Sequence, residues 1–294
     1  QGVTFVRLNV PLKIALRHDK RNMAKAENDS VLAALALIVE HVEQLHQYVV
    51  LCLNCEPAND SMIGGYDVED YIAVVCQTAK CKMPKSRKSL FQSSAVFSWE
   101  VGRFENMGVS SDDAVADYAR VLTSLKQTDP NHLVSISCGN SCHSRADLTL
   151  VEDLMNLPDV DYINMNLLPL EWKWTNTSSL YQTLPNVYIK AQEYFDDYLR
   201  FSRRINKPLI VSEISYPRDR NHFEPKSPVD ARNSCFNFVT NKLKQSEDDG
   251  NGLSAAFFGI FIDETEKHVP AAIYASDTQT LSEIALQKEK EKSK

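Results

Sequence analysis

The 294-residue chain lacks the features that mark several common classes of protein. Its net charge is −7 and its Lys and Arg residues form no basic stripe, which argues against nucleic-acid binding. The one short basic cluster, residues 80–89, is typical of a solvated loop. No apolar run approaches the ~20 residues needed to cross a bilayer, so no membrane span is expected. No glycine-rich turn follows the first predicted strand, which argues against a dinucleotide site.

The seven cysteines do not form a recognisable metal site. A structural zinc site prefers paired CxxC knuckles or His partners at fixed spacing, and only one CxxC is present. We expect no metal and no cofactor, with zinc as the less favoured alternative to local disulfides. The disulfide candidates are the closely spaced Cys52, Cys55, Cys76, Cys81, Cys138 and Cys142. The odd count leaves one thiol free or paired between chains.

Three N-glycosylation sequons support a secreted, extracellular protein: Asn28, Asn59 and Asn176 each begin an Asn-x-Ser triplet within a polar stretch. No signal peptide is visible, and Gln1 stands directly ahead of a predicted strand. We therefore expect a processed or truncated start.

The hydrophobic pattern alternates between strands and helices along the chain. The strands are continuous apolar runs, as expected for parallel strands covered on both faces. They are predicted at residues 3–10, 48–54, 95–101, 132–138, 161–168, 208–213 and 253–261. Helices are predicted at residues 30–47, with Ser30 as N-cap, and at 66–79, 112–127, 150–157, 187–205 and 228–245. A last helix begins at residue 281 and frays into a charged tail.

This alternation predicts an α/β protein with a (β/α)₈ TIM barrel, and an open doubly wound sheet is the alternative. Seven strands are counted where the barrel needs eight. The first strand is therefore expected to be missing or supplied from outside this chain. We predict a single barrel domain over residues 1–280 and a charged C-terminal tail over 281–294.

Polar and aromatic residues gather at the predicted carboxyl ends of the strands, where barrel enzymes place their sites. Glu213 ends one strand and Glu105 follows another. Sugars stack on aromatic rings, and retaining hydrolysis needs two carboxylates ~5 Å apart, so the pattern favours a sugar site. The candidate substrate-binding residues are Arg7, Asn166, Trp172, Trp174 and Phe258. Plain packing is the alternative for both tryptophans, and Glu100 and His132 are expected to be structural.

Four segments carry a specific resemblance: "AVFSWEVGRFEN", "TDPNHLVSISCGN", "VDYINMNLLPLEWKW" and the stretch that begins "KPLIVSEISYPRD". Their order and spacing resemble glycoside hydrolase family 5, most of all its endo-β-1,4-mannanase branch. The segment "GGYDVEDY" is similar to that branch as well. The resemblance covers about residues 3–261 and implies that Glu213 is the nucleophile.

The sequence departs from the family at several site positions. The family motif W-E-L-x-N-E-P supplies the general acid/base, but here Arg103 replaces its Asn and Phe104 replaces its catalytic Glu. Glu105 stands one residue later. A slip of one residue turns a strand side chain to the other face, so only a local bulge would return Glu105 to the site. The family's His-x-Tyr begins at Asn166 here, and Phe258 replaces the Trp that floors the sugar site.

These departures favour a pseudoenzyme, because general acid catalysis is worth roughly 10²–10⁴-fold. An arginine at position 103 would also hold Glu213 ionised. We therefore predict a secreted protein that keeps a mannanase-like fold for glycan binding or extracellular assembly. One alternative is an active retaining endo-β-1,4-mannanase with Glu213 as nucleophile and Glu105 as displaced acid/base. Another is a structural subunit of an extracellular complex. The expected partners are β-mannan or a related glycan, and other extracellular chains.

Overall fold

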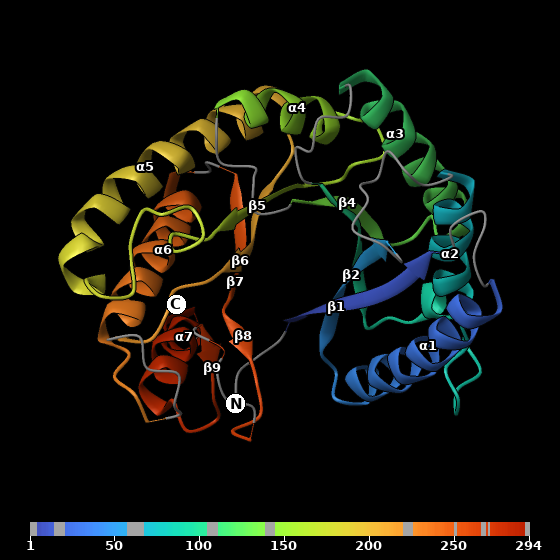
Figure 1. The fold of residues 1–294 in the computed structure, drawn as a ribbon, viewed down its shortest axis with the longest axis horizontal. Coiled ribbons are helices and arrows are strands. Elements are labelled where there is room, and N and C mark those ends of the chain that lie inside the picture. Colours follow the sequence, from blue (N-terminus) through green and yellow to red (C-terminus); the bar gives the residue numbers. More distant parts are fainter. Residues whose placement is uncertain are drawn as a thin grey trace. The chain divides into compact units, whose positions relative to one another are not determined.

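A computed structural model of the chain describes residues 5–14, 21–57, 68–104, 111–138, 145–219, 226–249, 252–265, 269 and 271–291. The chain forms two compact units. The N-terminal unit is Thr4–Ile163, and the C-terminal unit includes Asn164–Lys294. Strands and helices alternate in both units (Figure 1).

The N-terminal unit is built on a parallel sheet with strand order β1-β2-β3-β4. Its strands are β1 (Phe5–Ile14), β2 (Tyr48–Pro57), β3 (Val96–Phe104) and β4 (Leu133–Cys138). Its helices are α1 (Arg21–Gln44), α2 (Val68–Lys80), α3 (Ser111–Thr128) and α4 (Arg145–Met155), with the short η2 (Leu90–Gln92). Figure 1 shows α1, α2 and α3 along one face of this sheet. Residues 49–53 of β2 are buried because neighbouring strands and helices cover them.

Strand β3 contains a bulge near its carboxyl end. Val101 pairs with Ile136 and Phe104 pairs with Cys138, so β3 uses one residue more than β4 over this stretch. Gly102 lies in the bulge with φ +66°, a conformation that glycine adopts without strain. A Cβ atom at this position would overlap the ring and hydroxyl of Tyr118. Glu105 would need such a bulge to reach the site, but Glu105 itself lies outside the described residues.

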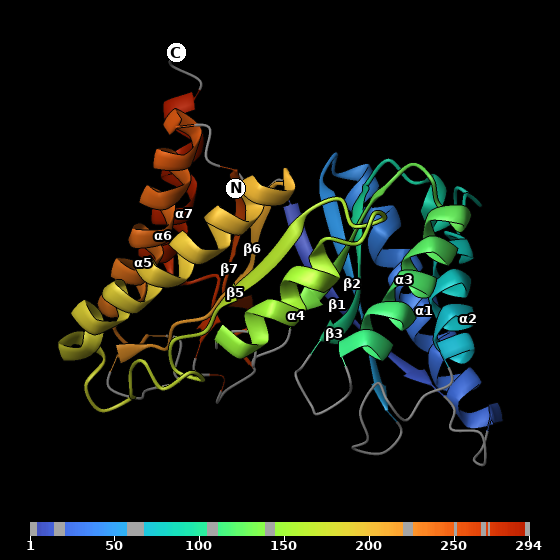
Figure 2. The same cartoon turned by 90° about the horizontal axis from the view of Figure 1, so that it is seen from above.

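The C-terminal unit is built on a three-stranded sheet with order β5-β6-β7. Its strands are β5 (Ile163–Leu167), which begins at the unit boundary, β6 (Leu209–Ile214) and β7 (Leu253–Phe258). Its helices are α5 (Leu180–Ile205), α6 (Asp230–Asp249) and α7 (Thr278–Glu291). Figure 2 shows these three helices side by side. A second small sheet pairs β8 (Ile260–Phe261) with β9 (Ala272–Ile273).

Several element boundaries differ from those expected. The first helix begins at Arg21, so Ser30 lies inside it rather than at its N-cap. Helix α5 begins at Leu180 and contains Pro185. Burial of Leu180 and Leu184 offsets the one backbone hydrogen bond that a proline removes. The last predicted strand is interrupted by Gly259, whose φ of +59° separates β7 from β8.

The disulfide prediction is wrong for the cysteines whose side chains are described. Cys52, Cys76 and Cys81 are thiols. The Cys76 thiol contacts the carbonyl of Ser124 at 3.7 Å, whereas the Cys81 thiol contacts the carbonyl of Leu32 at 3.6 Å. The two sulfurs therefore contact different helices, α3 and α1, and no bond joins them. The thiols of Cys55, Cys138 and Cys142 lie outside the described residues. Cys235 is a buried thiol, and burial raises its pKa to about 12.

No helix in the described part of the chain is long and apolar enough to cross a membrane.

Candidate functional site

A buried ion pair and the groups in contact with it join the four strands of the N-terminal unit. Arg7 of β1 contacts one carboxylate oxygen of Glu100 on β3, with its Nε at 2.8 Å and an Nη at 2.7 Å. The same guanidinium donates to the hydroxyl of Ser137 on β4 at 3.1 Å and contacts the sulfur of Cys52 on β2 at 3.1 Å. The Glu100 side chain is fully buried and that of Arg7 is 10% exposed. Because both side chains are buried, loss of either partner would leave an uncompensated charge in the interior.

The second oxygen of Glu100 accepts a hydrogen bond from the hydroxyl of Tyr162 at 3.1 Å. That hydroxyl also shares a hydrogen bond of 2.9 Å with Ser98. Burial raises the pKa of Tyr162 well above its usual value, and the negative charge of Glu100 raises it further. Tyr162 is therefore a neutral donor at physiological pH, and both carboxylate oxygens of Glu100 are satisfied.

This network bears on the role of two residues. Glu100 is the structural ion-pair residue that the sequence predicts, and that prediction is confirmed. Arg7 was expected to bind substrate, but its guanidinium already contacts Glu100, Ser137, Cys52 and the exposed Asn9. Its polar groups are thus used to tie four strands together. The prediction that Arg7 binds substrate stays a prediction.

In the C-terminal unit, Glu213 is the penultimate residue of β6 and is half-buried. The residue before it, Ser212, donates from its hydroxyl to the side-chain oxygen of Asn164 on β5. Asn166, two residues further along β5, is 5% exposed. Ser215, just past β6, donates its N–H to the carbonyl of Leu167 at 3.0 Å, so the carboxyl ends of β5 and β6 meet. The predicted nucleophile therefore stands where a barrel site would be.

Three aromatic residues expected to bind sugar pack against other aromatic rings of the protein. Trp172 and Trp174 are 7% and 9% exposed, and their rings lie 4.8 Å apart. Both rings contact Tyr194 of α5, at 5.2 and 6.0 Å between centroids. The structure thus favours the packing alternative for the two indoles. Phe258 is half-buried and packs edge-on against Phe236 of α6 at 5.1 Å.

The carboxyl group of Glu171, which the sequence analysis overlooked, is sensitive to the charge of Glu213. Glu171 occupies the turn that follows β5. Burial of its carboxyl group raises the pKa, the negative charge of Glu213 raises it further, and the backbone N–H of Glu171 itself partly offsets the rise. The signal in the sequence was the acid in "LPLEWKW", directly after a predicted barrel strand. It was missed because the family motif drew attention to the residues around Phe104.

The predicted acid/base region is only partly described. Arg103 and Phe104 lie on the backbone of β3, but their side chains are outside the described residues. The expected Arg103–Glu213 pair therefore stays a prediction. Where the structure is described, no group of three or more His, Cys, Asp or Glu side chains has the arrangement of a metal site.

The three sequons have different outcomes. Asn28 lies inside α1 and is 8% exposed. Its side-chain amide accepts from the backbone N–H of Lys13 and donates to the carbonyl of the same residue, both at 2.8 Å. A bulky glycan on this buried nitrogen has no room beside the Lys13 backbone, so Asn28 is unsuited to glycosylation in the folded chain. Asn176 is exposed, in a turn with Ser178 and Ser179. Asn59 lies outside the described residues.

Comparison with known proteins identifies the family. The model of "GH family 5 beta-mannosidase-like" proteins matches residues 80–275, two thirds of the chain. The chain belongs to glycoside hydrolase family 5. Among curated proteins, none matches. The family 5 assignment made from the sequence motifs is thereby confirmed at the level of a mannosidase-like member.

Solved structures of this family share the fold at low sequence identity. A family 5 mannosidase from Rhizomucor miehei is 14% identical, with a TM-score of 0.76 over 99% of this chain and 86% of that one. An endo-1,4-β-D-mannanase from Thermotoga petrophila is 14% identical, with a TM-score of 0.70 over 97% and 92%. An endoglucanase from Pseudomonas stutzeri is 14% identical, with a TM-score of 0.63 over 97% and 82%.

The predicted fold class is confirmed, because these family 5 structures are (β/α)₈ barrels. The described residues contribute seven strands to the two main sheets, the number counted from the sequence. The source of an eighth strand stays a prediction. In a family 5 barrel, Glu213 and Glu171 both belong to the carboxyl-end region in which this fold places its chemistry.

Proposed function

We propose that this family 5 chain binds β-1,4-linked mannosides at the carboxyl ends of its strands and hydrolyses them slowly at most. One observation carries the proposal: Glu213 keeps the nucleophile position, while Phe104 stands where the family places its general acid/base. The mannosidase-like family model supports a mannoside as the ligand class. The likeness of the sequence motifs to the endo-mannanase branch supports a β-1,4-linked chain over a single terminal sugar.

The rate penalty follows from the missing proton donor. Without protonation, the departing sugar oxygen leaves as an alkoxide, and general acid catalysis is worth roughly 10²–10⁴-fold. That loss corresponds to about 3–5 kcal/mol of transition-state stabilisation. The ground-state contacts that hold a sugar chain need no proton donor, so binding survives the loss.

The burial of Trp172 and Trp174 sets a bound on affinity. Sugar-binding sites gain much of their free energy from exposed aromatic faces, and these two indoles are used for packing on Tyr194. We therefore expect dissociation constants in the range of about 10 μM to 1 mM, which corresponds to roughly 4–7 kcal/mol.

An extracellular location forms part of the proposal. Of the described sequons, the one at Asn176 supports an extracellular location, because Asn176 is exposed and lies in a turn. The thiol state of Cys52, Cys76 and Cys81 gives it no support.

Calorimetric titration with mannohexaose, cellohexaose and xylohexaose tests the proposal. Saturable binding of mannohexaose, with weaker binding of the other two chains, is the expected result. Binding should weaken when Glu213 is replaced by Gln, and replacement of the exposed Glu193 on α5 should leave it unchanged. Absence of binding to all three chains would reject the proposal and favour a structural subunit.

The bulge in β3 supports a second candidate, an active retaining endo-β-1,4-mannanase with Glu105 as acid/base. One extra residue on β3 reverses the face to which the following side chains point, and Glu105 would need that reversal to reach the site. Rapid turnover of mannohexaose that Glu105→Gln abolishes would select this candidate.

A further inference from the structure

Residues 80–89, the basic cluster noted in the sequence, form an ordered hairpin in the N-terminal unit. Lys82 and Ser89 pair as an antiparallel bridge. The N–H of Met83 donates to the carbonyl of Lys88 at 2.9 Å. The Met83 side chain is fully buried, so it anchors the hairpin to the core of this unit. We call residues 80–89 the basic hairpin.

A buried carboxylate holds the turn of the basic hairpin. Glu40 of α1 is 5% exposed, and its oxygens accept the backbone N–H of Ser86 at 2.7 Å and that of Lys85 at 3.0 and 3.2 Å. The next residue, Arg87, has a φ of +61°, a conformation that persists only where the surroundings impose it. A buried carboxylate is unfavourable unless it is hydrogen-bonded, and here its bonds fix the backbone beneath exposed side chains.

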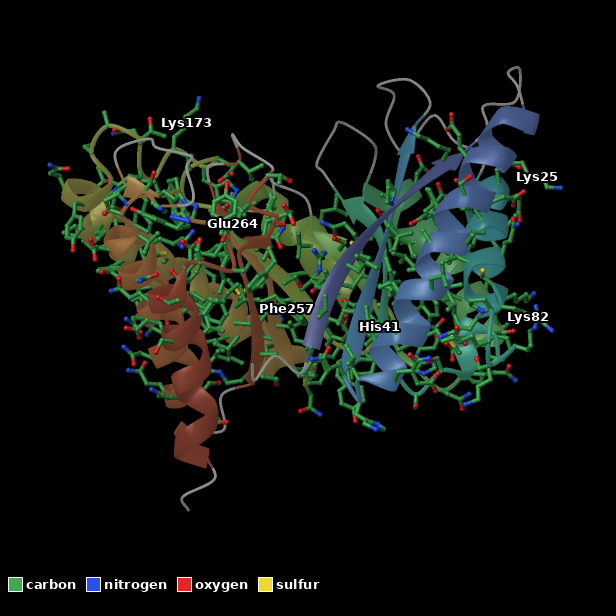
Figure 3. All side chains as sticks on the ribbon, turned by 90° about the horizontal axis from the view of Figure 1, so that it is seen from below. Lys25, His41, Lys82, Lys173, Phe257 and Glu264 are labelled. Atoms are coloured by element: carbon green, nitrogen blue, oxygen red, sulfur yellow. The ribbon has the colours of Figure 1, made fainter. Side chains whose placement is uncertain are left out.

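The basic hairpin gathers positive charge on a chain whose net charge is −7. It contains no acidic residue, and five of its side chains are exposed cations: Lys80, Lys82, Lys85, Arg87 and Lys88. Within the described part of the chain, only Lys88 reaches an acid, Glu43 of α1, at 3.5 Å. Figure 3 shows the side chain of Lys82 pointing outward from the N-terminal unit. Because the hairpin is held in one conformation, these cations stay together despite their mutual repulsion and attract a polyanion.

The basic hairpin lies away from the carboxyl ends of the strands. It follows α2 and precedes η2 and β3 along the chain. In an α/β barrel the connection from a helix to the next strand lies at the amino end of the sheet, whereas the chemistry belongs to the carboxyl ends. The basic hairpin is therefore a surface separate from the strand-end site.

We propose that the basic hairpin binds a sulfated polysaccharide. Four of its five cations are lysines, which act as point charges and lack the planar fork with which arginine binds a carboxylate. Recognition therefore depends on the charge density of the ligand, which is higher on a sulfated chain than on a carboxylated one. Neutral β-mannan offers no charge to this surface, so the inference is independent of the proposed function.

Two other classes of polyanion fit this surface less well. A membrane-binding hairpin presents apolar side chains for insertion, but here Met83 is fully buried and Pro84 is the exposed apolar residue. Proteins that bind single-stranded nucleic acid stack its bases on aromatic rings, and residues 80–89 contain none. A DNA duplex carries a dense phosphate charge, which the net charge of −7 on the chain would repel.

Fluorescence anisotropy with labelled dextran sulfate tests the inference on the intact chain. We expect saturable binding that weakens roughly 10²-fold between about 50 and 200 mM salt, because about five ionic contacts release their counterions. Lys82→Gln/Lys85→Gln/Arg87→Asn should weaken binding by about tenfold or more, with an unchanged circular dichroism spectrum. The variant keeps the hairpin backbone, because Glu40 accepts backbone N–H groups there and Asn tolerates a positive φ.

Two further variants separate the hairpin from overall charge. Lys25→Gln/Arg203→Gln/Lys244→Gln removes three exposed cations elsewhere and changes the net charge equally, so it should alter the affinity by less than about threefold. Glu40→Gln keeps all five cations and makes the chain less negative. It should nevertheless weaken binding by about threefold or more, because the turn is held less firmly.

Each remaining outcome counts against the inference. Equal losses in the two triple variants would show binding through overall charge and overturn it. Unchanged or tighter binding in Glu40→Gln would do the same. Tighter binding to vesicles of phosphatidylserine and phosphatidylcholine, or to duplex DNA, than to dextran sulfate would reassign the surface and overturn the inference. So would the absence of saturable dextran sulfate binding, whereas mannohexaose binding reports separately on the proposed function.

Discussion

Removal of Glu100 provides a sharp test of the network in the N-terminal unit. Replacement of Glu100 by Leu leaves the Arg7 guanidinium, 10% exposed, without its ionic partner. Breaking a buried pair from one side costs about 3–5 kcal/mol, because an uncompensated charge stays in the interior. Domains are stable by about 5–15 kcal/mol, so the variant should lose about a fifth or more of its stability.

Three contacts make up this cost. The Glu100 carboxylate accepts two donors from Arg7, at 2.7 and 2.8 Å, and one from Tyr162 at 3.1 Å. Hydrogen bonds to charged groups contribute roughly 1.5–3 kcal/mol each and do not add fully. Tyr162 keeps its bond to Ser98 in the variant, so its share of the loss is the smallest.

A double-mutant cycle separates the ion pair from the packing. Arg7→Met/Glu100→Leu removes both charges, and buried pairs replaced by apolar residues are often neutral or better. The double variant should therefore be more stable than Glu100→Leu alone. Asn9→Ala is the control, because it removes an exposed partner of the same guanidinium, at 3.2 Å, and should cost less than about 1 kcal/mol.

Urea denaturation followed by circular dichroism measures these differences. A loss below about 1 kcal/mol for Glu100→Leu would refute the reasoning. So would a double variant whose loss equals the sum of the two single losses, because additivity means that the groups do not interact.

Three further predictions concern other parts of the chain. Burial acts to raise the pKa of Asp129, but hydrogen bonds from His132 and Trp99 lower that pKa below its usual value. The Asp129 carboxylate therefore stabilises the fold above about pH 4. This stabilisation is lost as the pH falls through the pKa of Asp129 in the folded chain. Asp129→Asn should thus cost about 1–3 kcal/mol at pH 7, with a smaller difference from wild type near pH 3 in denaturant titrations; a constant difference would contradict this. Gly102→Ala should destabilise the folded chain by at least about 1–2 kcal/mol in the same denaturant titration, since φ is +66° and the added Cβ would overlap Tyr118. An unchanged denaturation midpoint would be inconsistent with the bulge. Expression through a eukaryotic secretory pathway should place a glycan on Asn176 and none on Asn28, as read by mass spectrometry of glycosidase-treated peptides; an occupied Asn28 would be incompatible with its bonds to Lys13.

The strands were the most predictable part of this fold. Each of the seven main strands was located from its run of apolar residues, because a strand covered on both faces needs no polar side. The start of α1 was missed, since residues 21–29 are mostly polar and carry no apolar stripe. Asn28 is held in α1 by a hydrogen bond from the Lys13 backbone. This is a tertiary interaction, so it cannot be predicted from the local sequence pattern.

The candidate site was predictable in part. Glu213 at a strand end and the ionic role of Glu100 followed from strand boundaries and the family motif. The cysteine spacings led to a wrong disulfide prediction. Cys76 lies in α2 and Cys81 directly follows it, but their sulfurs contact α3 and α1, respectively. The effect of the Glu213 charge on the pKa of Glu171 links residues 42 positions apart, so no local sequence pattern reveals it.

The most direct test of the central claim is the rate of mannohexaose hydrolysis before and after the family motif is restored. The Arg103→Asn/Phe104→Glu variant regains the residues that family 5 places at these positions. The account predicts that its kcat/KM exceeds that of the unmodified chain by about 10²-fold or more, with little change in binding. An unmodified chain that already hydrolyses mannohexaose as fast as the restored variant would contradict the account.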